Sequence, residues 1–166
     1  MWKGSCEGRE ESHFMDPVRQ TLLKGLDGDE KIRFLAILLR VARADGVSHL
    51  ERDRLQPMAE WVGAGVEEQA EAVRRAADES LTLESLVNGF QHGDKGLLLF
   101  RESCGVAWVD LTKTPEEEKL LSELARVLGI SQETREVLDS PLSASPEGER
   151  RFLDLLGGTS TAQTEG

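Results

Sequence analysis

The sequence predicts an all-α protein that folds as a single helical bundle. Helix start and stop signals recur along the 166 residues, whereas tyrosine is absent and apolar–polar alternation never lasts long enough to indicate a strand. The length suits one domain with a substantial core. We expect about seven to nine helices within residues 16–156. A flexible N-terminus over 1–15 and a disordered tail over 157–166 should flank them, because the tail offers no apolar side chains to bury.

The first two helices are predicted from their starts and their composition. Asp16 and Pro17 provide an N-cap and a proline at the first helical position, and the helix then runs through Leu23. Residues 29–44 are apolar on nearly every side, which is typical of a central helix. Three arginines form one narrow stripe on that helix, and they would either pair internally with carboxylates or dock an acidic partner or phosphate: Arg33, Arg40 and Arg43.

The segment after the central helix begins with an Asp-Gly pair at Asp45 and then reads S-x-x-E at Ser48 and Glu51. That pattern is a capping box, which opens a helix. Pro57 should kink or divide this helix, and Gly63 should end it. Its buried stripe is predicted to contain Leu55, Met58, Ala59 and Val62.

Further helices are predicted over residues 66–78, which are polar and rich in alanine, and after Thr82, which is an N-cap residue. The loop over 91–96 then leads to an apolar helix. The spacing of its apolar residues predicts one buried face. That face contains Leu97, Phe100, Cys104, Ala107 and Trp108.

A second capping box follows. Thr114 is the N-cap, Pro115 takes the first helical position and Glu117 completes the box. Gly129 should end the helix. Two shorter helices complete the domain, one after Ser131 and one after Ser145.

Two parts of the chain, 34–63 and 97–129, have the same order of features. Each consists of an apolar helix, an aspartate in the following turn, and a capped amphipathic helix that ends in glycine. Such a duplication predicts a pseudo-twofold bundle, since each helix pair needs the other to cover its apolar face. The corresponding residues are Asp45 and Asp110, Leu55 and Leu121, Ala59 and Ala125, and Gly63 and Gly129.

At these residues the sequence resembles the TerB-like family of helical domains, which is named after tellurite-resistance proteins. The family pattern is an apolar helix, A-x-A-D-G, a short turn and E-x-x-x-L-x-x-L-A, and the segment ARADGVSHLERDRLQPMA is similar to it. The second copy, VAWVDLTKTPEEEKLLSELARVLGIS, follows the same order with Leu111 in place of the glycine. The resemblance covers residues 30–140 and implies an all-α domain without an enzymatic centre.

The resemblance also implies a setting and a ligand. Family members are associated with tellurite and general chemical stress resistance and with metal-linked complexes near the membrane. Acidic residues of the two turns are the family's proposed ligands for a divalent cation, and they correspond here to Asp45, Glu51, Asp110 and Glu117. A calcium-like cation suits such a site, because hard cations prefer carboxylate, carbonyl and water oxygens. No other cofactor is expected.

The same acidic residues have an alternative, structural explanation. Glu51 and Glu117 stand where a capping box needs a glutamate, and an aspartate followed by glycine is a common helix stop. The protein would then be a protein–protein adaptor with no metal site, and it would expose apolar surface on one helix pair. His49 adds little to a cation site, since no second His or Cys lies at ligand spacing.

Composition restricts the partners and the compartment. A net charge of −11 argues against nucleic-acid binding, which needs clustered cations, and against docking by charge on an anionic membrane. The longest apolar run, FLAILL, is too short to insert into a bilayer, and the first residues lack the apolar core of a secretory signal. Two cysteines indicate no disulfide framework. We therefore expect a cytoplasmic protein whose partners are other proteins, in an oligomeric state that the sequence leaves open.

Catalytic patterns are not found in the sequence. It contains no G-x-S-x-G, H-E-x-x-H, P-loop or dinucleotide fingerprint. Cys104 lies on a predicted core face, where burial would suppress formation of the thiolate. We expect a protein without enzymatic activity.

Overall fold

The computed structural model describes residues 17–44, 56–60, 62–108, 112–141 and 145–165, with side chains described as far as Leu156. Every regular element in these ranges is a helix, which confirms the predicted all-α class. The helices are α2 (Pro17–Lys24), α3 (Gly28–Ala42), α5 (Val66–Ala77), α6 (Leu83–Leu86), α7 (Asp94–Ala107), α8 (Pro115–Leu128), α9 (Gln132–Leu138) and α10 (Pro146–Glu165), and residues 56–60 are also helical.

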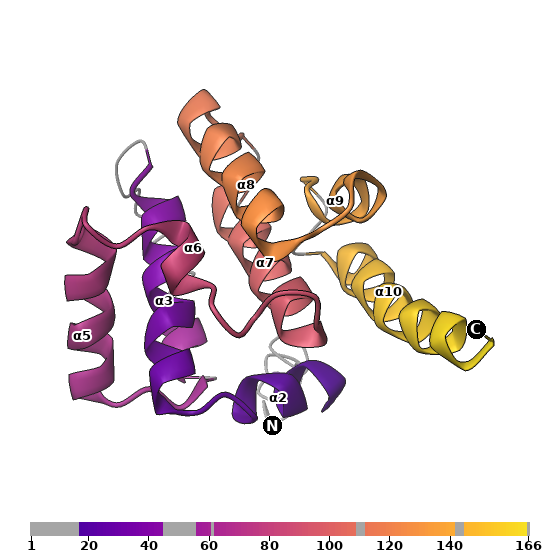
Figure 1. The fold of residues 1–166 in the computed structure, drawn as a ribbon, viewed down its shortest axis with the longest axis horizontal. Helices are drawn as coiled ribbons and strands as arrows, with labels where there is room; N and C mark the ends of the chain where they lie inside the picture. The colour runs from indigo at the N-terminus through magenta and orange to yellow at the C-terminus, as the bar shows by residue number, and fades with distance from the viewer. Residues whose placement is uncertain (1–16, 45–55, 61, 109–111, 142–144, 166) are drawn as a thin grey trace, which may run out of the picture.

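Two helices form the centre of the molecule. α3 buries every side chain from residue 34 to residue 38, as the sequence predicts for a central helix, and α7 buries every residue from 98 to 107. The two helices pack against each other, α5 packs on α3, and α8 packs on α7. Figure 1 shows α5 and α10 at opposite ends of this arrangement.

Three predicted N-cap residues are confirmed, whereas α7 begins at Asp94, inside the stretch 91–96 for which the sequence predicts a loop. Thr82, Thr114 and Ser131 each accept a hydrogen bond from the backbone N–H three residues ahead. α3 begins slightly earlier than predicted, at a capping box formed by Asp27 and Glu30. Ser48 and Glu51, the other predicted box, lie outside the described residues.

The two predicted glycine stops have the same geometry. Gly63 and Gly129 both have φ of 75°, a left-handed conformation that favours glycine. At each end, the residue after the glycine donates its N–H to a carbonyl five residues back, at Ala59 (3.0 Å) and Ala125 (2.9 Å). These helix ends are alike, but Asp45, Leu55 and Asp110 lie outside the described residues, and the internal duplication stays a prediction.

The structure extends α10 into the segment for which the sequence predicts a disordered tail. The helix continues to Glu165 and so includes nearly all of residues 157–166. The segment contains no proline, and adding residues to an existing helix costs far less than starting one.

Candidate functional site

Only one of the four predicted cation ligands lies in the described part of the chain. Asp45, Glu51 and Asp110 lie outside it, whereas Glu117 is buried in the first turn of α8. The Glu117 carboxylate accepts a hydrogen bond from the Thr114 backbone N–H (3.0 Å), and the Thr114 hydroxyl accepts one from the Glu117 N–H (3.1 Å). Glu117 therefore has the capping role, and it is only 2% exposed.

Acidic side chains near the start of α8 surround a lysine. The Lys113 ammonium lies 2.5 Å from Glu118 and 2.7 Å from Asp139, and it sits over the Trp108 ring at 5.2 Å from the centroid. Burial tends to lower the pKa of Lys113, but the hydrogen bonds to Asp139 and Glu118 outweigh it and raise the pKa. Arg135 pairs with the same two carboxylates, so one ammonium and one guanidinium together balance their charges.

No group of three or more His, Cys, Asp or Glu residues in the described ranges has an arrangement that could hold a metal ion. The carboxylates described around α8 instead have defined protein partners. Trp108 donates its indole N–H to Asp139 (2.8 Å), and Arg135 lies 2.6 Å from Glu118. This network joins α9 to the ends of α7 and α8.

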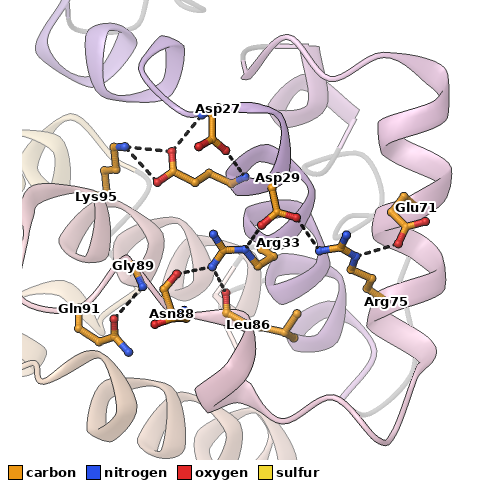
Figure 2. Close-up of polar contacts among 11 residues, drawn as sticks. Asp27, Asp29, Arg33, Glu71, Arg75, Leu86, Asn88, Gly89, Gln91 and Lys95 are labelled. Atoms are coloured by element: carbon orange, nitrogen blue, oxygen red, sulfur yellow. Dashed lines mark hydrogen bonds and ion pairs between the residues drawn. The ribbon is translucent and has the colours of Figure 1, made fainter.

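Two arginines of the α3 stripe, Arg33 and Arg40, are used within the fold. Figure 2 shows Arg33 between Asp29, at 2.7 Å, and the backbone carbonyl groups of Leu86, at 3.0 Å, and Asn88. Arg40 donates to three carbonyl groups at the carboxyl end of α5. Helix ends leave such carbonyl groups without partners. Both arginines therefore pair within the protein, as one of the two sequence-based alternatives expects. Their acceptors are mostly backbone carbonyl groups and not carboxylates.

A buried charge network on α7 was not predicted from the sequence. Glu102 is fully buried and lies 2.6 Å from Arg19 of α2 and 2.9 Å from Arg101. Arg101 also lies 2.7 Å from Glu149 of α10 and stacks 5.8 Å from the centroid of the Phe152 ring. The network therefore fastens α2 and α10 to the central helix.

The geometry gives no support to a catalytic centre based on Cys104. Its thiol is fully buried, as predicted, and burial raises its pKa well above the ordinary value. A hollow of about 470 Å³ lies elsewhere, between the start of α7 and the turn from α8 to α9. His92 and Asp94 at its wall are exposed, and Thr134 bonds locally to Ser131. The hollow thus contains no nucleophile paired with a base among the residues that line it.

The clearest candidate surface lies on α5. Val66 is 83% exposed and Val73 is 47% exposed, and Ala70 and Ala77 are exposed beside them. The spacing of these four residues, i, i+4, i+7 and i+11, places them on one face of the helix. Ala72 is the only described residue of α5 that is fully buried. We call the four exposed residues the α5 stripe.

A narrow apolar groove lies beside the α5 stripe, between α5, α3 and the helical residues 56–60. Its volume of about 180 Å³ is below the range of about 300–1,000 Å³ that is usual for small-molecule sites. It has room for an inserted side chain. Its lining residues are Leu35, Leu39, Gln56, Ala59, Gln69, Ala72 and Val73.

Comparisons with known proteins add no family. No family model, no curated protein and no solved structure matches the chain.

No helix in the described ranges is both long and apolar enough to span a bilayer.

Proposed function

We propose that the protein is a non-enzymatic helical interaction module that binds another protein chain through the α5 stripe and the adjoining groove. One observation carries the proposal: two valines and two alanines face solvent along one side of α5. This helix lies at the edge of the bundle (Figure 1). A groove that accepts an apolar side chain lies next to them. An apolar helix face beside a groove is a recurrent mode of peptide and helix recognition.

The adaptor alternative predicts exposed apolar surface on one helix pair, and the α5 stripe supports it in part, since these exposed side chains lie on α5 alone. The cation-binding alternative has less support, because Glu117 is used as a cap and the nearby carboxylates pair with Lys113 and Arg135. Under the TerB-like resemblance, the module would act inside a larger complex in resistance to tellurite or other chemical stress.

The proposal is tested by comparing Val73→Glu with Val18→Glu in the full chain. Val18 on α2 is 48% exposed, close to the 47% of Val73, and it lies outside the α5 surface. Each tagged variant is used to capture binding proteins from the source cells, and quantitative mass spectrometry compares them with the parent. Both variants should keep the parent melting curve by circular dichroism, since exposed substitutions usually change stability by less than about 0.5 kcal/mol.

We expect Val73→Glu to lose proteins that the parent and Val18→Glu both retain. A carboxylate in the stripe would have to be desolvated on binding, and this costs affinity. Equal capture by all three proteins would contradict the proposed function.

A further inference from the structure

The α5 stripe has the pattern of a coiled-coil seam. In the segment VEEQAEAVRRAA, Val66 and Val73 are seven residues apart, and so are Ala70 and Ala77. With the valines at heptad position d, the alanines fall at position a. Alternating valine and alanine gives a shallow seam, and small side chains allow two helices to approach closely.

The residues that flank the seam on one side carry opposite charges. Glu67 and Arg74 occupy the same heptad position, e, at the two ends of the stripe. Glu67 is exposed and has no ion pair with any residue that the structure describes. Arg74 is 67% exposed and pairs with Glu71 on its own helix. The other flank, position g, is uncharged, with Gln69 and Ala76.

This charge pattern is complementary to itself in one orientation. When a twofold axis relates two antiparallel helices, the same flank of each helix faces its copy in the reverse direction, so residues near the start meet residues near the end. Glu67 of one copy would then face Arg74 of the other, and the same pair would occur twice. In a parallel pair, position e would face the uncharged position g, and no such pair would form.

We propose that the chain binds a second copy of itself, with α5 packed antiparallel on α5 of the partner and with Glu67 paired to Arg74 across the twofold axis. This inference rests on the proposed function and names the partner for the same surface. We infer a second copy of the chain as the partner from charge complementarity, because Glu67 and Arg74 have opposite charges and face each other across the twofold axis. The seam spans only four residues per chain, so the dimer is weak, with a dissociation constant above about 1 µM.

Charge exchange in the full chain tests the orientation and the partner together. Sedimentation velocity over a concentration series should show a reversible monomer–dimer equilibrium for the parent. Glu67→Arg and Arg74→Glu should each weaken the dimer about tenfold, because each creates two like-charge pairs. The double variant carrying both changes should regain the parent affinity, and so should an equimolar mixture of the two single variants, as a heterodimer.

Val73→Glu should abolish the dimer, whereas Val18→Glu should leave it unchanged. A parent chain that stays monomeric up to millimolar concentration would overturn the inference, and so would a dimer that the two charge reversals leave unaffected. If the parent is monomeric but Val73→Glu still loses a captured protein, self-association is wrong and the proposed function stands. If Val73→Glu behaves as the parent in both experiments, both proposals are wrong.

Discussion

α5 and α7 reverse the usual relation between polarity and burial. α7 buries two charged residues, Arg101 and Glu102, whereas α5 exposes two valines. The reason is the number of neighbours: α7 packs against α2, α3, α8 and α9, but α5 packs mainly against α3. Which face of a helix is buried therefore depends on its place in the bundle, and a polar helix at the edge can still present an apolar surface.

The buried charges of α7 and the exposed valines of α5 have different consequences. The charged residues of α7 are retained inside because they hold α2 and α10 by ion pairs at 2.6 Å and 2.7 Å. The apolar residues of α5 have no comparable internal role, since the α5 stripe faces solvent. The centre of the molecule thus accounts for its cohesion, and its α5 edge is the part most suited to a partner.

The largest expected effect is on α7. Glu102→Gln removes the fully buried carboxylate that pairs with Arg19 and Arg101, and leaves the two buried guanidinium groups to share Glu149. We expect the free energy of unfolding, measured in urea, to fall by about 3 kcal/mol. Glu149→Gln is the matched control, because its side chain is 21% exposed and should cost less. A loss below about 1 kcal/mol for Glu102→Gln would show that the network contributes little.

The two helix ends formed by glycine can be compared in the same way, one next to α5 and one at the end of α8. Gly63 precedes α5 and Gly129 ends α8, and both have φ of 75°. Alanine in this conformation should cost about 1–2 kcal/mol at either position. At Gly129, an added Cβ would lie 2.3 Å from His92 Cε1, whereas at Gly63 the nearest atom is Lys31 Nζ at 3.5 Å. Thermal unfolding should therefore show a larger loss for Gly129→Ala, and equal losses would mean that His92 moves aside freely.

A smaller effect is expected at the contact between α5 and α3. Hydrogen bonds from Arg33, and then from Arg75 of α5, lower the pKa of Asp29 from its ordinary value of 3.8. Because the folded pKa is the lower one, this stabilisation is complete above pH 3.8 and is lost as the pH falls through the folded value. Asp29→Asn should cost about 0.5 kcal/mol at neutral pH, since the Asp29 side chain is 56% exposed and water screens its ion pairs. A difference from the parent that persists below the folded pKa would contradict this origin.

The smallest effect concerns calcium. If the acidic turn after α7 is structural, the melting temperature in millimolar calcium should equal that in a chelator within about 1 °C, because a ligand stabilises only a protein that binds it. Calorimetric titration with calcium gives an independent measurement. Saturable binding below millimolar concentration that disappears in Asp45→Ala or Asp110→Ala would restore the cation hypothesis.

The local signals in the sequence predicted the helices well. Thr82, Thr114, Ser131 and Gly129 mark helix ends through bonds to residues three to five positions away, and such bonds can be recognised in the sequence itself. The network around Glu102 could not be predicted in this way, because its partner Arg19 is 83 residues distant. Two charges within an apolar helix were the available signal.

The α5 stripe could be predicted only in part from the sequence. The repeat of valine and alanine over 66–77 can be recognised there, but the same repeat would suit a buried face. Only the packing of α5 on α3 shows that this side faces solvent. The three acidic residues Asp45, Glu51 and Asp110 lie outside the described ranges, so their role as ligands stays a prediction.

The network on α7 has a consequence for the order of events during synthesis. Arg101 has its ion pair with Glu149 and its ring contact with Phe152 only when α10 is present. On a ribosome, residues 17–138 leave the exit tunnel before α10 does, since synthesis proceeds from the N-terminus. A nascent chain without α10 thus carries a network in which Arg19 and Arg101 still lack their ion pairs with Glu149, and these pairs form once α10 has emerged.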